Sequence, residues 1–244
     1  MKKFIFTVIF IIIIYFLFST ILFNSMPNYD FDKIHKYNDM INYSENYKIK
    51  INPLSDTELQ SNKNKQLLYQ NSQNGKTFIF VVKAGNNFSL KNGLFIQNAY
   101  IEKEIGGNSK SIKKEIEITR PGGISVYPKM KESIYIDTFG CINFMKPNNH
   151  YLIFCEKEEI SDALKIPQYR ITPSLYSILN IDQDDSDCVS NSEKKTFVTD
   201  EYTQDSLVAP YNNCINREFM TSSQKTLNVF LSIKNDILKK YNIR

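Results

Sequence analysis

Hydrophobic residues are distributed very unevenly along this chain of 244 residues. Residues 4–23 form an uninterrupted apolar run that contains no charged side chain. A helix needs roughly 20 such residues, about 30 Å of length, to span the hydrocarbon core of a bilayer. The pattern therefore predicts a single transmembrane helix at the N-terminal end.

The flanks of this run predict its orientation. Lys2 and Lys3 precede it, whereas residues 24–28 carry no positive charge. Because basic flanks stay on the cytoplasmic side, we expect a signal anchor over 1–26 with the rest of the chain extracytoplasmic in the cell membrane. A cleaved signal peptide is the alternative, but its apolar core is shorter and a small-x-small pattern follows it, which is missing here.

After a polar stalk or lead-in over 27–48, short apolar or alternating stretches lie between turn signals in a domain over 49–244. Such spacing predicts a β-barrel or sandwich rather than βαβ units. The Pro121-Gly122-Gly123 sequence is expected to end a strand. The expected strands cover 47–51, 77–82, 94–105, 112–119, 133–137, two arms of a hairpin over 141–155, 169–172 and 176–181.

Two helices are expected around these strands. Ser55 and Glu58 have capping-box spacing, which predicts a helix start. Near the C-terminus, a second such spacing begins at Thr221 and predicts an amphipathic helix over 222–241. Its apolar positions recur three and four apart at Leu227, Phe230, Ile233, Ile237 and Tyr241. We expect this face to pack on the barrel; a membrane-surface or partner-binding helix is the alternative.

Two stretches of the central region carry a family resemblance. They contain Ala99, Ile101, Glu102, Ile105 and Gly106, and later Tyr151, Leu152, Ile153 and Phe154 after Asn148. Over about 77–172 this order resembles exported netrin/TIMP-like domains, which are OB-type barrels, and small bacterial membrane-anchored proteins of unknown role. The family has glycine where this chain has Asn148.

The resemblance implies a mainly β (α+β) fold, a five- to eight-stranded OB-like barrel or sandwich with a C-terminal helix. Inhibitors of this family use an N-terminal cysteine to reach the zinc of a protease. Here no cysteine precedes Cys141. Inhibitor function is therefore not expected.

Charge and cysteine content narrow the function classes. The net charge is +4, and it is +2 without Lys2 and Lys3. The sequence therefore has no large basic excess of the kind that indicates nucleic-acid binding. Four cysteines lie in the exterior part, where disulfides persist. They are Cys141, Cys155, Cys188 and Cys214.

The predicted hairpin favours one cysteine pairing. Cys141 and Cys155 are equidistant from Asn148 at its turn and would face each other. That leaves Cys188 to pair with Cys214. Four reduced thiols are the alternative, because export permits disulfides without requiring them.

A catalytic constellation is not evident in the sequence. His150 and Cys155 are five positions apart on one expected strand, so they point to opposite faces and do not form a nucleophilic pair. The sequence contains no C-x-x-C, glycine-rich phosphate loop, G-x-S-x-G or H-E-x-x-H motif. No catalytic or cofactor-binding residue is assigned.

Residues 182–193 form the one stretch with metal-ligand spacing. As a twelve-residue loop they resemble an EF-hand calcium loop, with oxygens at positions 1, 3, 5 and 12. These positions are held by Asp182, Asp184, Ser186 and Glu193. Asp187 replaces the usual glycine, and no exiting helix is expected at Lys194. A solvated acidic loop is the alternative to a calcium site.

Together these patterns predict a non-enzymatic binding or interaction module at the outer face of the membrane, with a protein or other cell-envelope partner. One alternative is a cell-envelope enzyme, hydrolase-like, whose site is assembled from residues distant in sequence. Another is a weak calcium-dependent structural module. A pocket with convergent ionisable groups would favour the enzyme, whereas an exposed apolar or sheet-edge surface would favour the binder.

Overall fold

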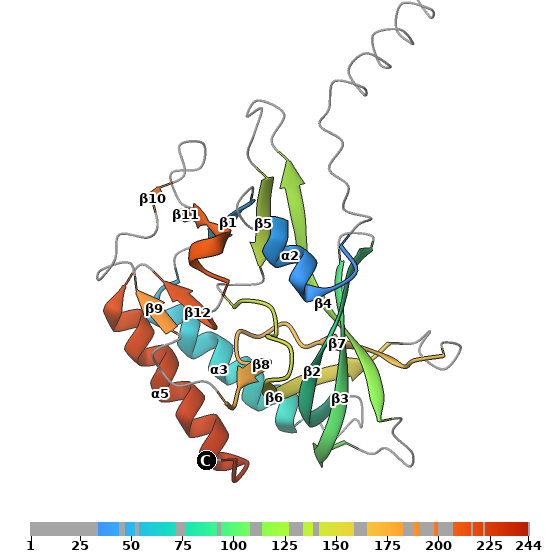
Figure 1. Cartoon of the computed structure of the whole chain (residues 1–244). Coiled ribbons are helices and arrows are strands. Elements are labelled where there is room, and N and C mark those ends of the chain that lie inside the picture. The colour runs from blue at the N-terminus through green and yellow to red at the C-terminus, as the bar shows by residue number, and fades with distance from the viewer. Residues whose placement is uncertain are drawn as a thin grey trace, which may run out of the picture. The chain divides into compact units, whose positions relative to one another are not determined.

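The structure is a computed structural model (Figure 1), in which part of the chain is described. The described residues are 34–43, 47–51, 54–71, 77–91, 94–107, 114–126, 134–138, 142–158, 165–182, 188–190, 198–199, 207–215, 217–221 and 223–243. None of the helices within these ranges is long and apolar enough to cross a membrane. The expected anchor at 4–23 lies outside them and stays a prediction.

Among the described residues, five strands close into a barrel (Figure 1). They are β2 (Thr77–Lys91), β3 (Leu94–Gly106), β4 (Glu115–Val126), β6 (His150–Lys157) and β7 (Gln168–Ile171). Pairing runs from β2 to β3, β4, β7 and β6 and back to β2, and only the β4–β7 pair is parallel. The predicted mainly β barrel is thereby confirmed.

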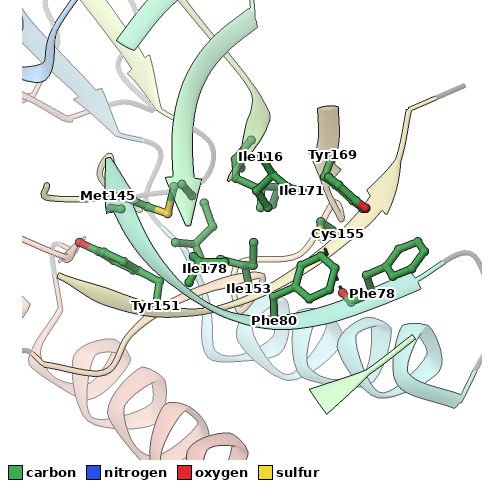
Figure 2. Packing of buried hydrophobic residues seen from close by; sticks show 14 residues of the cluster. Phe78, Phe80, Ile116, Met145, Tyr151, Ile153, Cys155, Tyr169, Ile171 and Ile178 are labelled. Carbon is green, nitrogen blue, oxygen red and sulfur yellow. Dashed lines mark hydrogen bonds between the residues drawn. The ribbon is translucent and has the colours of Figure 1, made fainter. Parts of the chain in front are cut away.

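The interior of this barrel is filled by alternate residues of its strands, as the period of two requires. Figure 2 shows this packing from close by. Phe78 and Phe80 of β2 meet the ring of Tyr169 edge-on, at centroid distances of 5.4 and 5.5 Å. The remaining buried members are Val82, Ala84, Ala99, Ile116, Ile118, Met145, Tyr151, Ile153, Cys155, Ile171 and Ile178.

Strand β4 belongs to two sheets, which corrects the expected strand end at Pro121. The strand continues past Pro121, which still pairs with Leu94 of β3, and its residues 122–126 then pair with β5 (Ile134–Thr138). Gly122 has a φ of 150°, a conformation open to glycine, so the chain bends here without ending the strand. The Pro121-Gly122-Gly123 sequence therefore marks the place where β4 passes from one sheet to the other, and not the end of the strand.

The second sheet extends from β5 through strands that are far apart in sequence. Strand β5 lies parallel to β1 (Tyr47–Ile51). The bounds of β1 coincide with those of the strand predicted over 47–51. The other edge of β1 pairs with β11 (Leu207–Pro210), and β11 pairs with β10 (Val198–Thr199). A separate parallel pair joins β9 (Cys188–Ser190) to β12 (Phe219–Thr221).

The predicted hairpin over 141–155 is wrong, because only its second arm is a strand. Both edges of β6 are already occupied, one by β2 and the other by β7 and β8 (Ile178–Asn180). Within the first arm, Ile142 makes an isolated bridge to Phe219. Asn148 adopts a φ of 70° in the turn, a conformation that asparagine tolerates.

Helix α3 (Asp56–Asn71) begins with the expected capping box. The Ser55 backbone nitrogen donates to Glu58 Oε2 at 2.7 Å, and the Glu58 nitrogen donates to Ser55 Oγ at 3.2 Å. The Ser55 nitrogen and the Ser55 hydroxyl both donate to the Glu58 carboxylate, and these two bonds lower the pKa of Glu58. The prediction of a helix starting at this sequence is confirmed.

Helix α5 (Gln224–Lys240) has the predicted amphipathic pattern, with Leu227, Phe230, Ile233 and Ile237 buried. Its N-cap is Ser223, whose hydroxyl accepts from the Thr226 nitrogen, so the predicted start at Thr221 is wrong. Thr221 is not available as a cap because it ends β12. Next to the helix, the ring of Tyr241 contacts that of Phe154 on β6 at 5.7 Å, and α5 crosses α3 (Figure 1). The apolar face of α5 packs mainly beside the barrel, where Phe230 stacks on Phe219 of β12 and on Tyr176, and Tyr241 makes the contact with the barrel strand β6.

A short helix, α2 (Tyr37–Tyr43), lies within the range expected to be a stalk or lead-in. Ile34, Tyr37 and Met40 are buried, and the carbonyl of His35 accepts from the Phe88 nitrogen of β2. A 3-10 turn, η6 (Tyr211–Asn213), precedes the last strand, β12. Residues from 34 onward therefore belong to the same packed unit as the barrel.

Candidate functional site

An irregularity in β2 shapes the outer face of the barrel. Between Ala84 and Phe88 the register with β3 shifts, so backbone groups of β2 lose their regular partners. Two side chains of β3 replace them. Gln97 Nε2 donates to the Gly85 carbonyl at 3.0 Å, and Asn98 Oδ1 accepts from the Asn87 nitrogen at 2.9 Å.

Gly85 is required for this arrangement. A Cβ at this position would lie 2.1 Å from Asn98 Oδ1, well inside van der Waals contact. The missing side chain therefore lets Asn98 lie across the bulge. Asn98 is only 5% exposed and lines the adjacent cavity.

This cavity, here called the outer hollow, has a volume of about 130 Å³. A single buried water needs only about 10–15 Å³, so the hollow has room for a small ligand group. Its wall comes from β2, β3, β4 and the segments before α2 and β7. The lining residues are His35, Asn87, Phe88, Ser89, Ile96, Asn98, Glu115, Glu117 and Ile166.

Two carboxylates of β4 face the outer hollow. Glu115 and Glu117 alternate with the core residues Ile116 and Ile118, so strand geometry directs both outward. Each is half-buried and bonds to an amide: Asn98 Nδ2 lies 3.4 Å from Glu115 Oε1, and Gln168 Nε2 donates to Glu117 Oε2 at 2.6 Å.

A second polar cluster lies on the same barrel, around His150 at the start of β6. Its Nδ1 is 2.8 Å from Asp182 Oδ2, and its Nε2 is 3.3 Å from Glu102 Oε1. The two ring nitrogens point in opposite directions, so the three groups cannot converge on one ion. Only a doubly protonated ring donates to both carboxylates at once.

Of the predicted calcium ligands, Asp182 alone falls in the described part of the chain. Its Oδ2 accepts from the backbone nitrogen and the ring of His150. Asp184, Ser186 and Glu193 lie outside that part. Within it, no group of three or more histidine, cysteine or acidic side chains is placed to hold a metal. The calcium site therefore stays a prediction.

Cys155 and Cys214 are free thiols in the structure, and both are buried. Cys155 points into the barrel, where Phe78 and Ile171 take the positions opposite it, so the strand geometry that favoured pairing it with Cys141 is absent. Burial raises the pKa of Cys155 and raises that of Cys214 to about 12. Cys141 and the side chain of Cys188 are not described, so the predicted pairs Cys141–Cys155 and Cys188–Cys214 stay predictions.

The thiol of Cys155 and the ring of His150 lie on opposite faces of β6, as the spacing predicted. Cys155 is part of the closed core, whereas His150 contacts Glu102 and Asp182 on the outside. The two cannot form a nucleophile and base pair.

A buried ion pair joins α5 to the strands. Lys234 Nζ is 2.5 Å from Glu218 Oε2, and the side chains are 0% and 3% exposed. Glu218 Oε1 also accepts from the Asn180 nitrogen of β8 at 2.8 Å. The cavity beside Glu218 measures only about 10 Å³, room for one water, so this network supports the fold rather than forming a ligand site.

Arg120, also buried, holds the segment that leads to β6. Its Nη1 and Nη2 donate to the carbonyls of Asn143 and Ile142, and its guanidinium lies 5.0 Å from the Phe144 ring centre. Burial lowers the pKa of Arg120 to about 10, which leaves it charged at neutral pH. The buried guanidinium holds these two backbone carbonyls in place and is not accessible to a ligand.

The residues that line the outer hollow were not predicted from the sequence as a site. Glu115 and Glu117 were part of an expected strand, and their alternation with isoleucine did signal an outward, common face. The contributions of His35 and Ser89 had no such signal, because they depend on tertiary contacts of α2 and on the bulge in β2.

Comparisons with known proteins leave the site to be interpreted from its geometry. No model of a known protein family matches the sequence, and no curated protein matches it significantly. Of the two cavities described above, the outer hollow is the one with room for a ligand group. Its geometry is therefore the basis for the proposed function.

Proposed function

We propose that this chain is a membrane-anchored, extracytoplasmic binding module, built on an OB-type barrel, that takes its ligand at the outer hollow. The strand order β2-β3-β4-β7-β6 with one parallel pair supports an OB-type barrel. Such barrels use an outer sheet face for binding. The anchor follows from residues 4–23 of the sequence.

One observation carries this proposal: polar side chains from β2, β3, β4 and the segment before α2 converge on a cavity of about 130 Å³. A concave site with a few convergent polar groups is typical of ligand binding. Within the described residues, no hydrogen bond joins Ser89 to His35, Glu115 or Glu117. The site therefore has recognition groups without an evident nucleophile and base pair.

A filled-cavity variant tests the proposal. Ile96, half-buried in the wall, is replaced by tryptophan to occupy the outer hollow, and Ile41→Trp on α2 is the matched control at an exposed position. Full-length protein in detergent is screened by saturation-transfer NMR against alkylammonium, guanidinium, carboxylate and monosaccharide probes. We expect at least one probe class to bind the native chain and Ile41→Trp but not Ile96→Trp. Equal binding by all three proteins would contradict the hollow as the ligand site.

A cell-envelope enzyme is the second candidate, favoured by the ionisable groups that share the outer hollow. Glu115, Glu117 and His35 could act as acid and base if a substrate brought them together. The check is turnover of nitrophenyl esters and glycosides by the native chain and by Glu117→Gln. Hydrolysis that is lost in the variant would favour the enzyme over the binding module.

A further inference from the structure

The wall of the outer hollow carries a net negative charge. Among the described residues that line it, Glu115 and Glu117 are acidic and His35 is the one basic side chain. His35 adds at most one positive charge, so the two carboxylates outweigh it in either protonation state. Lys36 and Lys114 adjoin the wall in sequence, but neither lines the cavity. The charge of the hollow therefore favours a positively charged ligand.

Both carboxylates have acceptor capacity left for a ligand. Glu117 Oε2 accepts from Gln168 Nε2 at 2.6 Å, and Glu115 Oε1 has a long contact of 3.4 Å with Asn98 Nδ2. Each of these partners is a neutral amide, which leaves the charge of the carboxylate uncompensated. A carboxylate offers about four lone-pair positions, so one amide does not fill it. Charged N–H donors would form stronger hydrogen bonds at the positions that remain.

Strand geometry sets the two carboxylates at a spacing that one cation can bridge. Glu115 and Glu117 are two residues apart on one face of β4, which places their backbone positions roughly 7 Å apart. A guanidinium group carries N–H donors on several sides, so it can donate to two carboxylates at once. Ammonium is a compact point charge with a shorter reach.

The apolar part of the wall favours an organic cation over a metal ion. Phe88, Ile96 and Ile166 line the hollow together with the polar groups. Hard metal ions require six or more oxygen ligands, which these side chains do not supply. Alkyl groups that carry a charged head pack well along such surfaces.

The volume of the hollow limits the size of its ligand. An engineered cavity of about 150 Å³ in another protein holds one benzene molecule. The outer hollow measures about 130 Å³. Sites for drug-sized molecules begin at roughly 300 Å³. One charged head group with a short alkyl substituent therefore matches the space.

We propose that the outer hollow binds a small organic cation of the alkylguanidinium class between Glu115 and Glu117. This proposal rests on the proposed binding function of the hollow and names the chemical class of its ligand. The two carboxylates accept the charged N–H groups, and Ile96 and Ile166 contact the alkyl part. The charge of the ligand is then the property that the site recognises, more than its shape.

The test compares N-methylguanidinium with N-methylurea, a neutral molecule of nearly the same shape. Binding to full-length protein in detergent is titrated by saturation-transfer NMR, with Ile96→Trp as the variant whose hollow is filled. We expect the native chain to bind N-methylguanidinium at least tenfold more tightly than N-methylurea, because only the cation forms charge-assisted hydrogen bonds. Ile96→Trp should abolish this binding.

Amide variants test the two carboxylates separately. Glu115→Gln and Glu117→Gln each remove one charge and keep the size of the side chain, so each should weaken binding of N-methylguanidinium about tenfold. Asp236→Asn is the matched control, because this exposed carboxylate lies on α5, pairs with Lys63 and does not line the hollow. Binding should be unchanged in this variant.

The outcomes separate the cation proposal from the binding function on which it rests. If Ile96→Trp blocks a neutral or anionic probe while N-methylguanidinium does not bind, the hollow remains a binding site and the cation proposal is overturned. If Ile96→Trp affects binding of no probe, both are overturned. Binding of N-methylguanidinium that both glutamine variants leave unchanged would also overturn the cation proposal.

Discussion

The ion pair between Glu218 and Lys234 is the residue contact with the largest expected effect on stability. Both side chains are almost fully buried, so removal of one charge leaves the other without a partner in a low-dielectric interior. We expect Glu218→Gln or Lys234→Met alone to lower the free energy of unfolding by about 3–5 kcal/mol. Chemical denaturation of each variant measures this loss.

The double variant Glu218→Gln/Lys234→Met completes the cycle. It removes both charges, so we expect it to be more stable than either single variant. A loss equal to the sum of the two single losses would mean that the charges act independently, against the geometry described here.

The buried phenol of Tyr37 predicts alkaline sensitivity. Burial raises its pKa from 10.0 to about 12. The unfolded chain releases this proton at lower pH than the folded chain does, so the stability contribution is full below pH 10 and is lost as the pH rises toward 12. Tyr37→Phe should therefore reduce the fall in unfolding free energy between pH 10 and 12. An unchanged slope would show that Tyr37 ionises as readily in the folded chain.

At the scale of helices and strands, local signals predicted whether a segment forms a helix or a strand, but not which partner it pairs with. The capping box at Ser55 and the strand Tyr47–Ile51 were both predicted from a few adjacent residues. The prediction failed where it required a particular pairing, because other strands occupy the same edges. The first arm of the expected hairpin is not a strand because β2, β7 and β8 occupy β6, and no local pattern reports that competition.

The outer hollow follows the same rule. The outward face of Glu115 and Glu117 could be predicted from alternation with Ile116 and Ile118. The cavity itself could not, because it depends on the bulge at Gly85 and on the tertiary position of His35. Gly85, between Ala84 and Asn86, gave no indication that a side chain of β3 would lie over it.

The N-cap of α5 provides a prediction at this scale. Ser223 accepts a hydrogen bond from the Thr226 nitrogen, so Ser223→Ala should lower the unfolding free energy by about 1 kcal/mol, whereas Ser223→Asp keeps an acceptor and most of the stability. Ser232→Ala, at an exposed position within the same helix, is the matched control and should change little. Equal effects of the two alanine variants would argue against capping. Thermal unfolding of the three variants makes the comparison.

For the whole molecule, the strongest expectation from sequence is membrane attachment through residues 4–23. Full-length protein should remain with membranes after alkaline carbonate extraction. Ile12→Arg places a charge near the centre of the run, at a cost of about 2.5–3.5 kcal/mol for insertion, and should release a measurable fraction. Complete extraction of the native chain would contradict a retained anchor and favour the cleaved signal peptide.

The pairing of β1 with β11 has a consequence for the order in which the protein takes shape during synthesis. The barrel strands occur between Thr77 and Ile171, so the barrel can close before the chain is finished. Strand β1 is made earlier, yet its partner Pro210 appears near the end. Contacts so distant in sequence form slowly. Until translation passes Pro210, one edge of β1 stays without its native neighbour, and the nascent chain needs protection there.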